Sequence, residues 1–393
     1  MAEAQNIPVG STTAGSIAVA AESTVATRMS APPSFDVQDF PVPHGREEEW
    51  RFTPLERLRG LHDGTAVATG EGVKVEVEAP EGVTVETVGR DDARIGKAGT
   101  PVDRIAAQAY SAFEKAGVVT VPKETVLTEP IRIAVHGEGG TRFGHQVIEL
   151  GAFAEAVVVI DHTGDAVLAA NVDYILGDGA KLTVVSVQDW DDKAVHVAQH
   201  NALLGRDASF KSVVVTFGGD VVRLHPRVSY AGTGGEAELF GLYFTDAGQH
   251  QEHRLLVDHN APHCKSNVVY KGALQGDDAH AVWIGDVLIE AKAEGTDTYE
   301  MNRNLVLTDG ARVDSVPNLE IETGEIVGAG HASATGRFDD EQLFYLMARG
   351  IPADEARRLV VRGFFAELVQ QIGVDDIEAR LLEKIDAELE ATV

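Results

Sequence analysis

The stretch Gly179–Val187 reads Gly-Ala-Lys-Leu-Thr-Val-Val-Ser-Val, a turn of small residues followed by a short apolar strand. The same arrangement returns at Asp207-Ala208, which the strand Phe210–Val215 follows. Related pairs are Gly151-Ala152, Glu236-Ala237, Asp278-Ala279 and Gly310-Ala311. The successive alanines of these pairs lie 28, 28, 29, 42 and 32 residues apart. A nearly constant period of this length is typical of a repeat architecture.

Three short strands with their turns would use about this many residues in each repeat, which is the arithmetic of a β-helix. An ordinary β-sandwich also has short strands and turn signals, but its hairpins need not return the same turn at a constant spacing. The pattern therefore predicts a mainly β protein whose core, residues 125–336, is a β-helix.

The segments on either side of this core differ from it in residue composition and in periodicity. Residues 1–33 are rich in Ala, Ser and Thr without periodicity, which predicts a disordered tail. Residues 34–124 are mixed and predict a small α/β or helical unit, with a helix over 103–115 that Gly117 ends. Residues 337–393 predict a helical unit in which Gly350 and Gly373 end the first two of three helices.

Composition limits the classes of function. The chain has 393 residues and a formal charge of −29, which disfavours nucleic acid or an anionic membrane as a partner. Its single cysteine, Cys264, excludes an intramolecular disulfide and a thiolate cage of its own for a cluster. No apolar stretch approaches the ~18 residues of a membrane span, and the N-terminus lacks the basic region of a signal peptide. We therefore expect a cytoplasmic protein.

Nucleotide and nucleophile motifs are missing from the sequence. There is no Gly-x-x-x-x-Gly-Lys-Ser/Thr, and no Gly-x-Gly-x-x-Gly that follows a strand and opens a helix. There is also no Gly-x-Ser-x-Gly elbow. The chain is therefore expected to have no nucleotide site of its own.

A group of histidines offers an alternative reading, a stand-alone metal-binding β-helix enzyme. His250, His253, His259 and His263 crowd beside Cys264. On a helix, His250 and His253 would share a face and could chelate a metal ion. The flanking Leu255–Val257 favour a strand, on which residues three apart point to opposite faces.

Four stretches, in order along residues 48–365, carry a family resemblance. The C-terminal stretch combines Ser-Val-Pro-Asn-Leu-Glu-Ile-Glu (315–322), Gly-His-Ala-Ser-Ala-Thr-Gly (330–336) and the run 339–351. The other three are Glu48–Thr53, Val121–Leu127 and His259–Asn267. Together they resemble the SufB/SufD family of iron–sulfur cluster assembly scaffolds. The resemblance implies a right-handed parallel β-helix between smaller N-terminal and C-terminal units.

Within that family the chain resembles the SufD branch. The SufB branch typically has a cysteine shortly before the Val-Pro step, where this sequence has Ala311. In the SufD branch a histidine of the Gly-His stretch faces that SufB cysteine and is a proposed cluster ligand, and His331 matches it. Many relatives have a cysteine two residues earlier, but here Ala329 stands in its place. His331 is thus the one candidate iron ligand that the resemblance offers at the interface.

The resemblance also implies a function and partners. It implies a non-catalytic scaffold subunit of a SUF-type complex that pairs with a SufB-like scaffold and shares a transient iron–sulfur cluster with it. An ABC-type ATPase, SufC-like, would dock on the C-terminal helices, and the matching signature offers Phe344, Tyr345, Arg349 and Gly350 as contacts. A reduced flavin is associated with some complexes of this family, but this sequence has no flavin motif.

Overall fold

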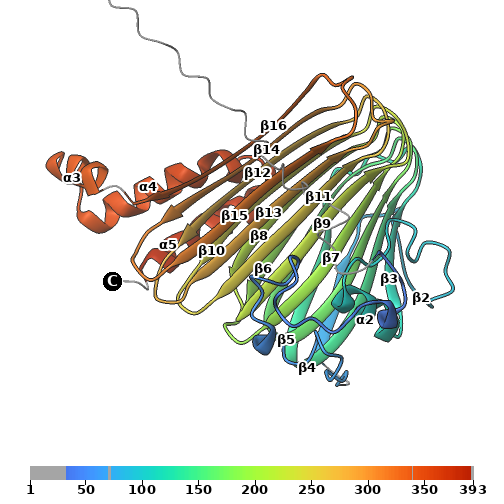
Figure 1. Cartoon of the computed structure of the whole chain (residues 1–393), viewed down its shortest axis with the longest axis horizontal. Helices are drawn as coiled ribbons and strands as arrows, with labels where there is room; N and C mark the ends of the chain where they lie inside the picture. The colour runs from blue at the N-terminus through green and yellow to red at the C-terminus, as the bar shows by residue number, and fades with distance from the viewer. Residues whose placement is uncertain (1–31, 70–71, 339, 391–393) are drawn as a thin grey trace, which may run out of the picture.

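The computed structural model describes residues 32–69, 72–338 and 340–390 and consists mainly of a parallel β-solenoid of about eight turns (Figure 1). Strands β5–β16 form one continuous hydrogen-bonded order, β15-β13-β11-β9-β7-β5-β6-β8-β10-β12-β14-β16, and β1–β4 join it through the pairing of β4 with β5. The first half of β5 pairs with β6 and its second half with β7, so this strand joins two parallel ladders. The predicted β-helix core is confirmed. The tail predicted for residues 1–33 lies almost wholly outside the described residues.

The first five strands form the start of the solenoid, and the later strands form its regular coils. The strands are β1 (Val73–Glu78), β2 (Thr84–Val88), β3 (Ala116–Val121), β4 (Ile131–Leu150), β5 (Glu155–Leu176), β6 (Lys181–Trp190), β7 (Val195–Leu204), β8 (Ser209–Gly218), β9 (Val221–Tyr230), β10 (Glu236–Thr245), β11 (His250–His259), β12 (Lys265–Leu274), β13 (His280–Ile289), β14 (Asp297–Val306), β15 (Arg312–Ile321) and β16 (Gly328–Arg337). The helical elements are η1 (Val37–Asp39), η2 (Leu55–Arg57), α2 (Arg104–Ala112), α3 (Asp340–Ala348), α4 (Ala353–Val369) and α5 (Asp375–Glu390).

Each regular coil consists of two strands of ten residues, one in each ladder, as in β6 and β7. The expectation of three short strands in each coil was wrong. The repeat length gives the number of residues in one coil, but it does not show how many strands and corners those residues form. Strands of ten residues span about 33 Å, so two long sides joined by tight turns use the same length of chain as three short sides.

One turn position explains both the alanine repeat and the buried cysteine. Ala180, Ala208 and Cys264 immediately precede strands β6, β8 and β12, and all three are buried in the solenoid core. Cys264 is therefore the small apolar residue of its coil. The irregular spacing of 42 arises because Ala237 lies inside β10, whereas Ala279 precedes β13 of the other ladder.

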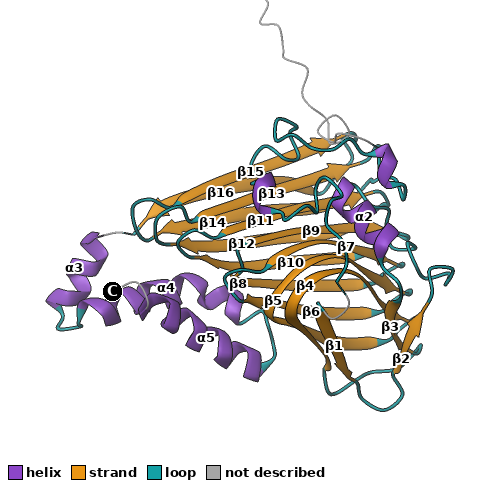
Figure 2. Cartoon of the chain, turned by 90° about the horizontal axis from the view of Figure 1, so that it is seen from below, coloured by secondary structure: helices purple, strands orange, loops and turns teal. Residues whose placement is uncertain are grey.

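Helices α4 and α5 cover the outer face of the ladder of even-numbered strands (Figure 2). Val361 and Phe365 of α4 pack with outward-facing valines such as Val213 and Val215 of β8. Gly350 and Gly373 both have positive φ, +89° and +66°, just after α3 and α4. Glycine reaches this conformation without a Cβ penalty, so the predicted ends of these helices are confirmed.

The N-terminal elements cover the outer face of the other ladder. Trp50, Leu58 and Ile105 pack against residues of β5 and β7 such as Ala169 and Val197. The carboxylate of Asp103 accepts a hydrogen bond from the Ala106 N–H and caps α2. The helix ends at Ala112, so the prediction that Gly117 ends it was wrong, because Gly117 lies in β3.

None of the helices that the structure describes is long and apolar enough to cross a membrane.

Candidate functional site

The C-terminal end of the solenoid is open. Strands β15 and β16 end the two ladders, and each pairs with one neighbour, β13 and β14 respectively. Helices α4 and α5 pack on the side of the solenoid, so the last coil remains uncovered by the described residues. An unpaired strand edge presents free backbone N–H and C=O groups, which makes this end a template for contact with another chain.

His331 lies on this open end. It is on β16, in register with Glu300 of β14, and its side chain is 44% exposed. The residues of β14 alternate between buried and exposed, and Glu300 is one of the buried, inward-facing set. Because parallel strands in register present side chains to the same face, His331 is directed toward the interior axis at its exposed end.

Glu300 is the closest charged neighbour of His331. Its Oε1 lies 3.9 Å from the Nδ1 of His331, and this buried oxygen has no hydrogen-bond partner among the described groups. Burial of the side chain, with a smaller contribution from Asp286, raises the pKa of Glu300 to about 8. The pair therefore combines an accessible imidazole with a poorly solvated carboxyl group behind it.

A hydrogen-bonded network lines the rest of the last coils. The amide of Asn304 donates to Asn302 over 2.6 Å, and Ser315 Oγ donates to the same Asn302 oxygen over 2.7 Å. Ser333 Oγ donates to Ser315 Oγ over 2.8 Å, which links β16 to β15 across the end. Tyr243 OH also bonds Asn304. The interior thus changes from apolar to polar as it approaches its exposed end.

The histidines around Cys264 are not brought together. In β11, His250 faces the side occupied by Glu252 and His280, with His280 Nδ1 at 3.2 Å and the Glu252 carboxylate at 3.2 Å. His253 faces inward, where Thr216 Oγ1 lies 2.9 Å from its Nε2. His259 also faces inward, 2.8 Å from Ser266 Oγ, and His263 lies exposed in the next turn. The strand geometry that separates these side chains was anticipated from Leu255–Val257.

Cys264 itself is poorly suited to act as a ligand or nucleophile. Its thiol is buried and lies 3.6 Å from the carbonyl oxygens of Gly232 and Pro262. Burial raises the pKa of the thiol, so the reactive thiolate is disfavoured. Within residues 32–69, 72–338 and 340–390, no three His, Cys, Asp or Glu side chains are grouped closely enough to hold a metal ion. A cluster bound at His331 would need further ligands from another chain or molecule.

A second exposed surface lies on α3 and the turn after it. Phe344 and Tyr345 are 72% and 56% exposed, and the guanidinium of Arg349 lies 4.9 Å from the ring centre of Tyr345. Gly350 ends this segment with φ +89°. Large apolar side chains exposed next to one another are typical of a surface that contacts another protein.

Glu300 belongs to no motif that would mark it as a site residue in the sequence. Its place beside His331 depends on the register between β14 and β16, which are neighbouring strands from successive coils of the solenoid. The repeat length was the available signal, because a residue one repeat before His331 is its expected neighbour. The turn alanines are irregularly spaced in this part of the chain, so the repeat length alone did not give the register between β14 and β16.

The chain is similar to proteins of iron–sulfur cluster assembly. A family model described as "SUF system FeS cluster assembly, SufBD core domain" matches residues 133–364. An iron–sulfur cluster assembly SufBD family protein of Mycobacterium tuberculosis is 60% identical, over 91% of this chain and 92% of that protein. The iron–sulfur cluster assembly protein SufD of Escherichia coli is 26% identical, over 88% and 89% of the two chains. SufD of Bacillus subtilis is 27% identical, over 68% of this chain and 62% of that protein.

Proposed function

The chain belongs to the SufBD family of the SUF iron–sulfur cluster assembly system, and from this membership we propose that it is a non-catalytic, SufD-like scaffold subunit. It would act in the cytoplasm beside a SufB-like scaffold and a SufC-like ATPase. The observation that carries the proposal is the position of His331, exposed on the last strand of a solenoid end that no described residue covers.

The open end supports a role shared between two chains. A nascent cluster is the cargo of such a complex, and it has to be held and then released. His331 offers one imidazole, and the chain offers no accessible thiolate nearby, since Cys264 is buried. A partner would supply the remaining ligands, and a site with few thiolates should release its cluster more readily.

Glu300 lies behind this ligand. Its Oε1 is 3.9 Å from Nδ1 of His331, so Nε2 is the ring nitrogen left toward the open end. At that distance the two groups form no hydrogen bond, so Glu300 marks the inner side of the ring without fixing it. His331 would therefore bind iron of the cluster through Nε2.

We expect His331→Ala to lower cluster assembly by the complete complex at least tenfold while the subunits still associate. Loss of a ligand should cost no less than the roughly 10–100-fold that loss of a supporting neighbour costs. Cluster formation would be followed by visible absorbance and by iron and sulfide content. His136→Ala is the matched control, because His136 is exposed on β4 in the first coil. Normal assembly by His331→Ala would remove the ligand role.

The surface on α3 is our candidate for docking the ATPase. Phe344, Tyr345, Arg349 and Gly350 lie together there, and Phe344 is too exposed to serve as a core residue. Large aromatic side chains at the centre of an interface often contribute about 2 kcal/mol or more each.

Phe344→Ala is accordingly expected to weaken binding of a purified SufC-like ATPase about 30-fold or more, as measured by titration calorimetry. Phe153→Ala is its control, because Phe153 is also an exposed phenylalanine but lies in the turn before β5. Equal binding by both variants would place the ATPase elsewhere.

Co-purification tests the proposal as a whole. The tagged full-length chain would be expressed with the SufB-like and SufC-like proteins of the same cell, and the captured proteins identified by mass spectrometry. A stable complex with both is expected. A chain that is captured alone, with stoichiometric bound metal, would overturn the scaffold proposal and favour a metal enzyme.

A further inference from the structure

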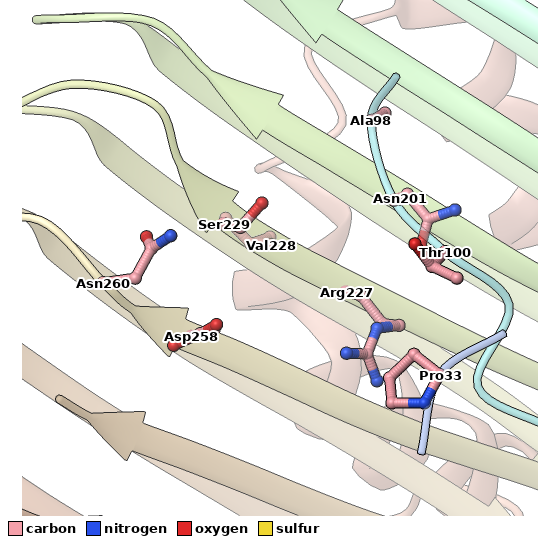
Figure 3. A pocket seen from close by; sticks show the side chains of 10 residues that line it. Pro33, Ala98, Thr100, Asn201, Arg227, Val228, Ser229, Asp258 and Asn260 are labelled. Atoms are coloured by element: carbon pink, nitrogen blue, oxygen red, sulfur yellow. The ribbon is translucent and has the colours of Figure 1, made fainter. Parts of the chain in front are cut away.

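A cavity of about 300 Å³ lies on the outer face of the odd-numbered ladder, whereas His331 is on β16 of the other ladder. Its floor is formed by β7, β9 and β11, and its rim by the loop Ala98–Thr100 and by Pro33 (Figure 3). Neither the proposed cluster site nor the proposed docking surface includes any of its residues. Its size is at the lower end of the range of small-molecule sites.

The floor carries two opposite charges that do not pair with each other. Arg227 of β9 lies in register with Asn201 of β7, and Ser229 lies in register with Asp258 of β11. Arg227 and Asp258 are therefore diagonal neighbours on one face, and both line the cavity (Figure 3). Diagonal pairs on adjacent strands are ~7–8 Å apart at the backbone, which leaves room for a small group between the two charges.

Neither charge has an ion-pair partner within contact distance in the described part of the chain. Arg227 forms no ion pair or side-chain hydrogen bond with the residues that the structure describes, and Oδ1 of Asp258 is buried without a partner. Burial lowers the pKa of Arg227 to about 10. Burial, with a contribution from Glu290, raises the pKa of Asp258 to about 6. Both groups are still charged at neutral pH, and both side chains are half-buried, so the lack of an ion-pair partner is unfavourable.

Neutral hydrogen-bonding groups stand between and around the charges. Asn260 accepts a hydrogen bond from the Tyr230 N–H through its side-chain oxygen, so its amide N–H groups remain available. The hydroxyl groups of Ser229 and Thr100 also line the cavity. The side chain of Asn201 is already hydrogen-bonded to Asp173 and Gln199, so it is a fixed part of the cavity wall and not a free donor.

We propose that this cavity binds a small zwitterion of the α-amino-acid type, with its carboxylate on Arg227 and its ammonium group on Asp258. A guanidinium group presents two parallel N–H donors that match a carboxylate. The carboxylate of Asp258 would form an ion pair with the ligand's ammonium group, as carboxylates do with the side-chain ammonium group of lysine. A ligand with only one charge would leave the other half-buried charge unpaired, which is the physical basis for selectivity.

The test is a binding screen on the purified full-length chain by saturation-transfer NMR, followed by calorimetry. The probes are the twenty standard L-amino acids, tested singly, with sodium acetate and methylammonium chloride as single-charge fragments at equal ionic strength. At least one amino acid is expected to bind saturably, and at least tenfold more tightly than either fragment. Arg227→Gln and Asp258→Asn should each weaken that binding at least tenfold.

Two further variants separate binding from folding. Arg227→Lys keeps the charge but loses the paired donors, so it should retain weaker binding even if Arg227→Gln fails to fold. Arg206→Gln removes an arginine from an exposed turn and should leave binding unchanged. Absence of saturable binding by all twenty amino acids would overturn the proposal, as would acetate binding equal to that of the best amino acid. The first result would leave a water-filled cavity, and the second a simple anion site.

Discussion

Lowering the pH from 7 to 5 is expected to lower the free energy of unfolding by several kcal/mol. Burial lowers the pKa of seven histidines of the described chain. The pKa falls to about 4 for His162 and His259 and to about 3 for His200 and His253. It falls well below its usual value for His196 and His225, and it is also lowered for His280. The fold therefore holds these rings neutral.

The sign of the effect follows from proton binding. An unfolded histidine has a pKa of about 6.5, so below that pH the unfolded chain takes up protons that the folded chain excludes until about pH 4. Stability is therefore lost as the pH falls through this window. Glu300 and Asp258 act in the opposite direction, because their pKa values are raised and the folded chain binds their protons first. Six strongly shifted histidines against these two carboxyl groups leave a net difference of about four protons, or roughly 5 kcal/mol per pH unit between pH 6 and pH 5.

Chemical denaturation at pH 7, 6 and 5 measures this slope directly. His253→Gln should reduce the slope by about 1.4 kcal/mol per pH unit, because it removes one titrating ring while a side-chain amide remains near Thr216. His136→Gln should leave the slope unchanged, since His136 is exposed. A free energy of unfolding that is constant from pH 7 to pH 5 would contradict the prediction.

Arg223→Met is expected to lower the free energy of unfolding by about 3–5 kcal/mol. Arg223 is a buried residue of β9 that connects the N-terminal segment, α2 and the solenoid. Its guanidinium donates to the Asp103 carboxylate over 2.7 Å and to Glu252 over 3.3 Å, and it lies 4.1 Å from the ring centre of Trp50. Methionine fills much of the same volume but leaves the buried Asp103 carboxylate without its cation.

The control for this variant is Arg206→Met, because Arg206 is 58% exposed and pairs with Asp178 and Asp207 in solvent. It should change stability by less than about 1 kcal/mol. Urea unfolding gives both values, and limited proteolysis shows whether the N-terminal unit is released first. A loss below about 1 kcal/mol in Arg223→Met would mean that the buried ion cluster contributes little beyond packing.

The local pattern predicted the elements that depend on nearby residues. The three C-terminal helices were placed from apolar spacing and from Gly350 and Gly373, because a helix end is set by the conformation of a few consecutive residues. The opposite faces of His250 and His253 followed from the two-residue period of a strand. Gly117 was misread because a glycine after a helical pattern can end a helix or serve in a strand, and its neighbours across the sheet decide which.

The sequence by itself determined the solenoid class, the family and the candidate histidine His331, because a repeat and a motif are properties of the linear chain. Only the tertiary structure decided the number of strands in each coil, the position of Glu300 beside His331, and the placement of Arg227 and Asp258 on one cavity without an ion-pair partner among the described residues. These features depend on register between strands that are about one coil apart in sequence. Register is fixed by the packing of the whole core, since a shift of one residue would turn every buried side chain to the opposite face.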